Sequence, residues 1–245
     1  MSMRPGRRGA DLPYQLLAGV VSCPGGWLAA TAKLQGITMA PEDPQVFGRF
    51  LDVLDYKPAY QVIAVFSPIG LLDEPAERGR TCEREARRLL GRPRSAAIAS
   101  APTRAALECE AYDEARAKNG GRLNPAVWRR WAKIAEVDQV IAPYWQRTVF
   151  EVHPELSFFQ LNGDRPVGWG KHRHSGREER EHLLRARLPG VERIIDARVR
   201  GVRREQLLDA AACLWTARRI AARATSRLPE HPEWDALGLR MEILR

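Results

Sequence analysis

Three carboxylates occur in sequence surroundings that could support metal-dependent chemistry. Glu151 lies inside the apolar stretch of residues 148–152, and Asp209 lies among small and apolar side chains in a helical pattern. Glu205 precedes Asp209 by four residues, a spacing that places both acids on one face of a helix. Two divalent ions about 4 Å apart need several converging carboxylates. Glu151, Glu205 and Asp209 are therefore candidate catalytic residues for cleavage of a phosphodiester.

The same acids have a second interpretation, which is structural. A buried ionised carboxylate is strongly destabilising unless a metal ion, backbone N–H groups or an arginine compensates its charge. Arginine is abundant, because the 39 basic residues include only 5 lysines. A buried network of ion pairs that braces a strand against a helix would account for the three acids equally well. The residue types leave both interpretations open.

Basic side chains supply candidates for phosphate contact. The formal net charge of +9 favours polyanions through phosphate attraction and counterion release, so nucleic acid is a possible partner. Lys171 begins a basic loop, and either it or His172 is a candidate to assist at the phosphate. The alternative is that these side chains are ordinary solvated surface, paired with nearby acids. The candidate phosphate-binding residues are Arg80, Arg104, Lys133, Arg173 and Arg177, with Arg84 and Arg87 beside the first.

Length and composition predict a globular protein. The chain has 245 residues, of which 44% are hydrophobic and 28% charged, so one core can serve the whole length. We expect a flexible basic tail at residues 1–12 and a single domain at residues 13–245. No apolar run reaches the roughly 20 residues that cross a bilayer, so we expect a cytoplasmic protein without membrane contact. The sequence does not indicate a protein partner or an oligomeric state.

Hydrophobic periodicity predicts an α/β fold that would position these residues. Residues 14–21 and 27–34 form an expected hairpin, followed by a third strand at residues 37–40. A helix at residues 43–54 would then cross over to a parallel strand at residues 61–66, giving a mixed sheet flanked by helices. Helical patterns predict an insertion at residues 82–90, 103–118 and 125–137. The remaining expected elements are a strand at 148–152, helices at 154–161, 177–187 and 203–223, and a strand at 238–244.

Taken in order, these segments resemble the bacterial domain of unknown function 429 family, also called the predicted RNase H-like nuclease family. GVVSCPGGW at residues 19–27 resembles its GVDGCxGGW strand and turn, and AVFSPIGL at residues 64–71 resembles its xVDIPIGL segment. The resemblance implies an RNase H-like fold. Further matches are RTCEREARRLLG at 80–91, KIAEVD at 133–138, EVHPELSF at 151–158, KHRHSGREER at 171–180 and LLDA at 207–210.

The resemblance also implies four acidic positions, and two of them are changed here. Val21 stands where the family has an Asp on the first strand, and Phe66 stands where it has an Asp before the PIGL turn. Glu151 and Asp209 match the other two positions, and Glu205 keeps an acid that the family also has. Apolar side chains at Val21 and Phe66 remove ligand oxygens, so the ordinary two-metal mechanism is expected to fail.

These features give three functional hypotheses. The first is a degenerate relative that binds nucleic acid or another polyanion with weak or no phosphodiesterase activity. The first hypothesis requires no cofactor. The second is a divalent-metal-dependent nuclease in which Glu151 and Asp209 hold Mg²⁺ or Mn²⁺. The third is a repurposed site that binds or transforms a small molecule or docks a protein partner; its residues are the acids with Ser22, Cys23, Phe66 and Ser67.

Overall fold

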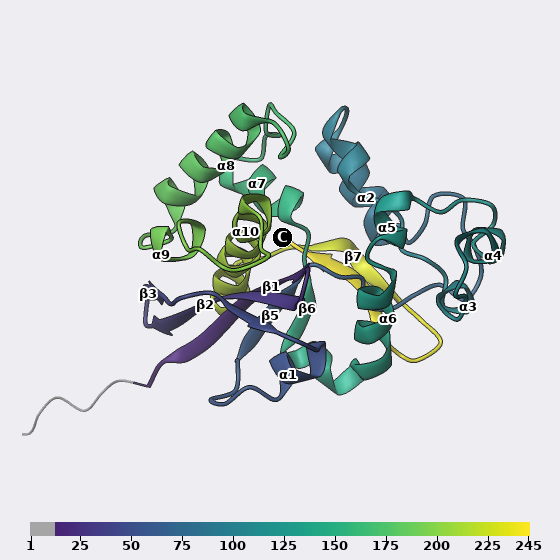
Figure 1. Cartoon of the computed structure of the whole chain (residues 1–245), viewed down its shortest axis with the longest axis horizontal. Helices are drawn as coiled ribbons and strands as arrows, with labels where there is room; N and C mark the ends of the chain where they lie inside the picture. Colours follow the sequence, from purple (N-terminus) through teal and green to yellow (C-terminus); the bar gives the residue numbers. More distant parts are fainter. Residues whose placement is uncertain (1–12) are drawn as a thin grey trace, which may run out of the picture.

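A mixed six-stranded sheet forms the centre of the computed structural model, which describes residues 13–245 (Figure 1). The expected tail at residues 1–12 lies outside the described residues. The strands of the sheet are β1 (Gln15–Cys23), β2 (Gly26–Gln35), β3 (Thr38–Pro41), β4 (Gln45–Phe47), β5 (Val62–Val65) and β6 (Val149–Glu151). The order is β3-β2-β1-β5-β6, and β4 pairs with β2. β1, β2 and β3 are antiparallel neighbours, whereas β5 is parallel to both β1 and β6. The predicted mixed α/β sheet is confirmed.

Helices cover both faces of this sheet, and this explains why β1 is apolar on both sides. Leu17 and Val21 alternate with Leu16 and Val20, so the two pairs point to opposite faces. The first pair packs in the cluster that contains α10, and the second in the cluster that contains α1 and α6. The helices are α1 (Phe50–Leu54), α2 (Thr81–Leu90), α3 (Arg104–Leu107), α4 (Tyr112–Lys118), α5 (Pro125–Trp128), α6 (Trp131–Val140), α7 (Pro154–Leu161), α8 (His174–Arg187), α9 (Glu192–Ile195) and α10 (Arg204–Ala221).

α10 lies against β1 with almost no space between the two backbones. A Cβ atom added to Gly19 would stand 2.1 Å from the Leu214 nitrogen and 2.3 Å from the Ala210 oxygen. Only glycine permits this approach, and the small side chains of α10 contribute to it on the helix side. The close contact fixes the register of α10 over the sheet, and therefore the position of its acidic side chains.

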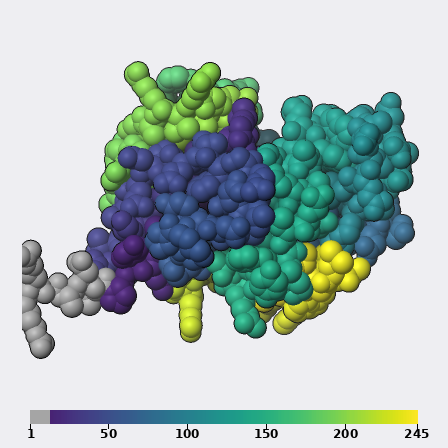
Figure 2. All heavy atoms as spheres, turned by 60° about the horizontal axis from the view of Figure 1, so that its bottom comes forward, coloured from purple at the N-terminus to yellow at the C-terminus, as the bar shows by residue number. Residues whose placement is uncertain are grey.

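The predicted helical insertion separates β5 from β6 and lies to one side of the sheet (Figure 1). It contains α2 to α6 and two 3₁₀ helices, η1 (Arg94–Ala97) and η2 (Pro143–Arg147). The hairpin of β7 (Arg227–Trp234) and β8 (Arg240–Leu244) lies beside it, as Figure 2 shows in yellow and teal. Arg104 joins the two parts, because its guanidinium lies 2.6 Å from Asp235 on the hairpin and 3.1 Å from Asp138 on α6.

Several element predictions were wrong in detail. The helix expected at residues 43–54 is only α1, because Gln45–Phe47 pairs with β2 as β4. The helix expected at residues 103–118 breaks into α3 and α4, and the Trp131 indole nitrogen donates to the Cys109 carbonyl at this break, at 3.3 Å. The pattern at residues 125–137 likewise divides into α5 and α6.

The strand β7 was not predicted, since two prolines and alternating charges hide its apolar signal. It pairs only with β8 within the described strands. A parallel bridge between Val152 and Leu244 joins β8 to the chain just after β6. No helix of residues 13–245 combines the length and apolar character that crossing a bilayer requires.

Candidate functional site

The four positions singled out by the motifs meet at the carboxyl ends of the central strands. Phe66 follows β5 directly, and its backbone nitrogen donates to the Val20 carbonyl at 2.8 Å, next to Val21 on β1. Glu151 ends β6 opposite Val65. Asp209 comes from α10, whose first turn is held at the end of β1 by a hydrogen bond from the Gln206 amide to the Ser22 carbonyl, at 2.9 Å. The structure therefore places these positions around one edge of the sheet.

Glu151 is buried in an ion-pair cluster rather than open to the edge. Its two carboxylate oxygens accept from the Arg80 guanidinium at 2.6 and 2.8 Å, and one also accepts from the Ile69 backbone N–H at 2.7 Å. Arg80 donates in addition to Glu83 at 2.9 Å, and its side chain is only 2% exposed. Burial opposes the charge of Arg80, but the neighbouring carboxylates raise its pKa well above the ordinary value. Arg80 is thus the partner of an acid and has no surface to offer a phosphate.

The two acids of α10 also have basic partners. The Lys171 ammonium donates to one oxygen of Asp209 at 2.6 Å, and Asp209 is 5% exposed. The second oxygen of Asp209 is buried with no hydrogen-bond partner among the described residues. Arg177 donates to Glu205 at 3.1 Å. Lys171, predicted to assist at the phosphate, thus lies at the site and binds one of its acids.

Two side chains, Arg130 and His153, pack against the Phe66 ring. The Arg130 guanidinium lies 4.4 Å from the centroid of the Phe66 ring, and the His153 ring lies 4.6 Å from the same centroid in a T-shaped contact. Burial lowers the pKa of Arg130, whereas the Asp209 and Glu151 carboxylates act in the opposite sense. A guanidinium thus stands within electrostatic reach of both surviving acids.

His153 is neutral at physiological pH. Burial, together with the charges of Arg130 and Lys171, lowers its pKa to about 3. Its Nδ1 accepts from the Glu155 backbone N–H at 3.2 Å and so caps the first turn of α7. A hydrogen bond with the Ala97 backbone engages the ring as well. His153 therefore holds α7 and η1 in place and is not a free ligand.

These residues do not fit a two-metal centre. Val21 and Phe66 are apolar, and each surviving acid already binds a cationic side chain. Within residues 13–245, no group of three or more His, Cys, Asp or Glu side chains is arranged to hold a metal ion. The arrangement corresponds to the ion-pair interpretation of the three acids, and chemistry that depends on two divalent ions has no set of ligands here.

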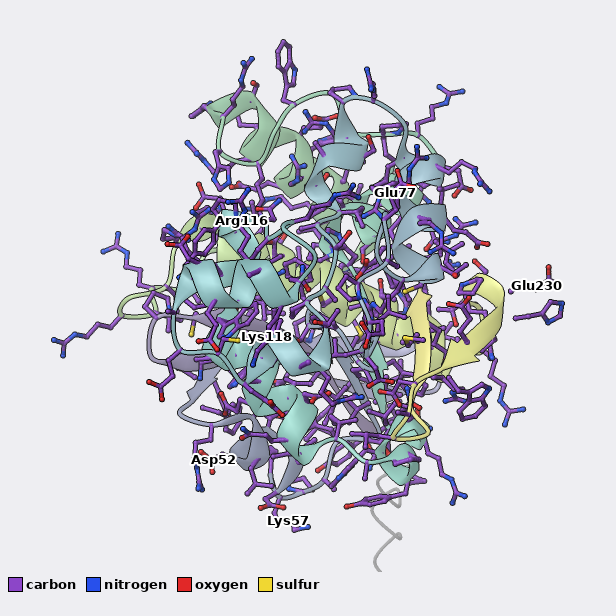
Figure 3. The ribbon with its side chains drawn as sticks, turned by 90° about the vertical axis from the view of Figure 1, so that its right-hand side faces the viewer. Asp52, Lys57, Glu77, Arg116, Lys118 and Glu230 are labelled. Carbon is purple, nitrogen blue, oxygen red and sulfur yellow. The ribbon has the colours of Figure 1, made fainter. Side chains whose placement is uncertain are left out.

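The other candidate phosphate-binding residues are spread over the molecule. Lys133 pairs with Glu136 at 2.8 Å, and Arg104 binds the acids that join the insertion to the hairpin. Arg84 and Arg87 donate to backbone carbonyls near their own helix. Figure 3 faces the insertion, with Arg116 and Lys118 on its outer side. Arg173 is exposed, no hydrogen bond or ion pair engages its side chain within residues 13–245, and it lies 5.6 Å from the ring centroid of Trp169.

Sequence reasoning missed Arg130 and Arg94. Arg130 precedes the KIAEVD segment, and the only available signal was a basic residue next to a matched motif. Arg94 lies in η1 with one terminal nitrogen 3.6 Å from the position of a Gly170 Cβ, which places it beside the loop of Lys171. A recess of about 30 Å³, large enough for about two water molecules, opens between the turn after β5, the end of β6 and the start of α6. Its lining includes Phe66, Ser67, Arg130, Glu151 and His153.

Cys23 does not form a nucleophilic centre with the residues around it. The thiol is partly exposed at the end of β1, and burial raises its pKa, so the thiolate is disfavoured at neutral pH. The other three cysteines are buried free thiols.

Comparison with known proteins gives one match. A family model described as a protein of unknown function, DUF429, matches residues 9–234. No curated protein and no solved structure matches the chain.

Proposed function

The chain belongs to DUF429, a family of proteins of unknown function, and from this premise we propose that it binds nucleic acid or another polyanion as a degenerate RNase H-like member. Phosphodiester hydrolysis is weak or absent in this proposal. The strand order supports the RNase H-like part, because three antiparallel strands are followed by two parallel ones in the order β3-β2-β1-β5-β6. The functional part depends on the side chains at the sheet edge.

The observation that carries the proposal is the neutralisation of every surviving acid by a basic side chain. Glu151 binds Arg80, Asp209 binds Lys171, and Glu205 is held by a third basic residue, Arg177. A two-metal nuclease needs these carboxylates free to share divalent ions. Here the charge that metal ions would compensate is already balanced by the protein itself, so the site keeps its shape without metal.

Unpaired cations around the same edge support polyanion binding. In the described part of the chain, no hydrogen bond or ion pair engages the side chains of Arg94, Arg130 and Arg173, and the Arg173 guanidinium lies over the Trp169 ring. Trp169 is 50% exposed. Exposed aromatic rings beside arginines stack on the bases of single strands, while the arginines attract phosphates. Single-stranded nucleic acid is therefore the polyanion that this surface suits best.

Calorimetry with Mn²⁺ and Mg²⁺ tests the loss of the metal site. We expect no tight binding by the wild type and measurable Mn²⁺ binding by Val21→Asp/Phe66→Asp, which restores two ligand carboxylates. The matched control is Val21→Asn/Phe66→Asn, with similar size and polarity but no added charge. Tight binding by the wild type that Asp209→Asn abolishes, with circular dichroism unchanged, would contradict the proposal.

Oligonucleotide binding in EDTA tests the proposed binding of nucleic acid without metal. Fluorescence anisotropy with a labelled single strand should show binding that weakens steeply as salt rises. Incubation of the same strand with Mn²⁺ should leave it intact. Failure to retain any oligonucleotide even at low salt would remove the binding part of the proposal.

A further inference from the structure

We infer that the recess beside Phe66 binds a terminal phosphate, with Arg130 and Ser67 as the residues that recognise it. The inference rests on the proposed function, because it specifies which part of a nucleic acid the site takes. A phosphate monoester at the end of a strand is distinguished here from the diesters inside the strand.

Arg130 is the cation of this site. Its guanidinium is partly buried and stacks on Phe66, which fixes the plane of the group. It has five N–H donors, and none of them donates to another described residue. A desolvated cation without a contacting anion is unfavourable, and this is why burial lowers its pKa. A phosphate oxygen within hydrogen-bond distance would supply the missing partner.

Ser67 is an independent second observation. It is 3% exposed, and its hydroxyl oxygen has no hydrogen-bond partner among the described residues, although buried polar atoms are nearly always paired. The same recess is lined by Ser67 and Arg130. Two donors that lack partners therefore face one small space, from the turn after β5 and from the start of α6.

The acids near the recess do not occupy the N–H donors of Arg130, because they are bonded to other basic side chains. Glu151 and Glu83 are both hydrogen-bonded to Arg80, and Asp209 is bonded to Lys171. Arg130 acts on Asp209 and Glu151 only through space. Because Arg80 binds both Glu151 and Glu83 and Lys171 binds Asp209, Arg130 is the cation of the recess that no acid contacts. Arg94, beside Gly170, and Arg173, over the Trp169 ring, add positive charge on the neighbouring loop, which attracts an approaching anion.

The size of the recess selects the end of a strand. A volume of about 30 Å³ excludes a nucleobase and admits only one or two oxygen atoms of a phosphate, the rest of which stays at the mouth. Its inner lining is closed, since Ser67 and Glu151 are 3% and 7% exposed. A diester inside a strand joins two nucleotides, so the strand must leave the recess on both sides. A monoester at the end of a strand joins only one, so the strand leaves on one side. A monoester also carries up to two negative charges and three terminal oxygens for Arg130 and Ser67.

The test compares one oligonucleotide in 5′-phosphorylated, 3′-phosphorylated and unphosphorylated form by fluorescence anisotropy, with EDTA present. We expect the wild-type chain to bind at least one phosphorylated form about tenfold more tightly than the unphosphorylated one. Arg130→Gln and Ser67→Ala should reduce this preference below about twofold. Arg129→Gln is the matched control, because its exposed neighbouring side chain removes the same charge and should keep the preference.

The outcomes separate this inference from the proposed function. Equal binding of all three forms by the wild type overturns the terminal-phosphate site and leaves polyanion binding in place. If no oligonucleotide binds, calorimetry with phenyl phosphate decides: binding that Arg130→Gln abolishes supports the site for a free monoester, while no binding overturns it. Either result in that second case overturns the nucleic-acid function. Thermal unfolding of each variant checks that it is folded.

Discussion

Arg80 and Glu151 form a bidentate ion pair inside the protein, with nitrogen–oxygen distances of 2.6 and 2.8 Å. They are 71 residues apart in the chain and join α2 of the insertion to the end of β6. The same guanidinium donates to Glu83 and to the carbonyls of Ile69 and Gly70. Glu151, which its motif marks as catalytic, thus anchors the helical insertion to the sheet.

Arg80→Met should lower the free energy of unfolding by about 3–5 kcal/mol, since breaking a buried pair leaves Glu151 and Glu83 without their cation. Urea unfolding followed by circular dichroism measures this change. Arg88→Met on the same helix is the control, because Arg88 is exposed; we expect it to stay within about 0.5 kcal/mol of the wild type. A loss for Arg80→Met no larger than the control's would contradict the structural role of the pair.

His153 should make stability fall in acid. Its pKa is lowered from 6.5 to about 3 in the folded protein, so between these pH values the unfolded chain binds a proton that the folded one does not. Stability from this group is present above pH 6.5 and decreases as pH falls toward 3, by up to about 1.4 kcal/mol per pH unit. His153→Asn keeps a side-chain acceptor for the cap but does not titrate. The difference in stability between the two proteins should change through this window; a constant difference would exclude the buried neutral histidine.

Gly19→Ala should be severely destabilising. The added Cβ would lie 2.1 Å from the Leu214 nitrogen, a backbone atom that cannot move without displacing α10. We expect a loss of more than about 3 kcal/mol, or no folded protein. Gly48→Ala is the matched substitution, because its Cβ would meet nothing closer than Asp52 at 3.8 Å, and it should be neutral or stabilise by up to about 1 kcal/mol. Similar melting temperatures for the two variants would disprove the close contact of β1 and α10.

Most of the sheet was predictable, because apolar runs determine it. β1, β2, β5 and β6 all lie within about two residues of their expected positions, and α7 has the expected bounds. The elements that failed depend on tertiary contacts. Residues 45–47 belong to a helical spacing of apolar side chains, but they pair with the free edge of β2 and form a strand. Helical periodicity also gives no sign of the break at Cys109, where the Trp131 indole nitrogen binds the carbonyl.

The sequence predicted where the candidate site lies but not which of its side chains bind one another. The order of strands brings Val21, Phe66 and Glu151 to one sheet edge, and the packing of α10 on β1 adds Asp209. Which cation meets which acid could not be predicted, since Arg80 and Lys171 reach their partners from segments far away in sequence. Arg130 was missed for the same reason: only the folded chain places it over Phe66.

The salt dependence of oligonucleotide binding should identify the cations that contact phosphate. For single strands, the slope of log K against log salt concentration changes by about 0.7 for each phosphate contact that is removed. Arg94→Gln and Arg173→Gln should each make the slope shallower by about this amount, because neither side chain has an ion pair to lose within the described chain.

The control for this measurement is Arg185→Gln. Arg185 is also a surface arginine, so the variant has the same net charge, but its guanidinium is engaged by Asp196 at 3.0 Å and Glu192 at 3.1 Å. Removing it should leave the slope almost unchanged, since this side chain already neutralises acids on its own surface. If Arg94→Gln, Arg173→Gln and Arg185→Gln all shift the slope equally, the attraction comes from total charge alone. The sheet edge near Phe66 and Lys171 is then not the binding surface.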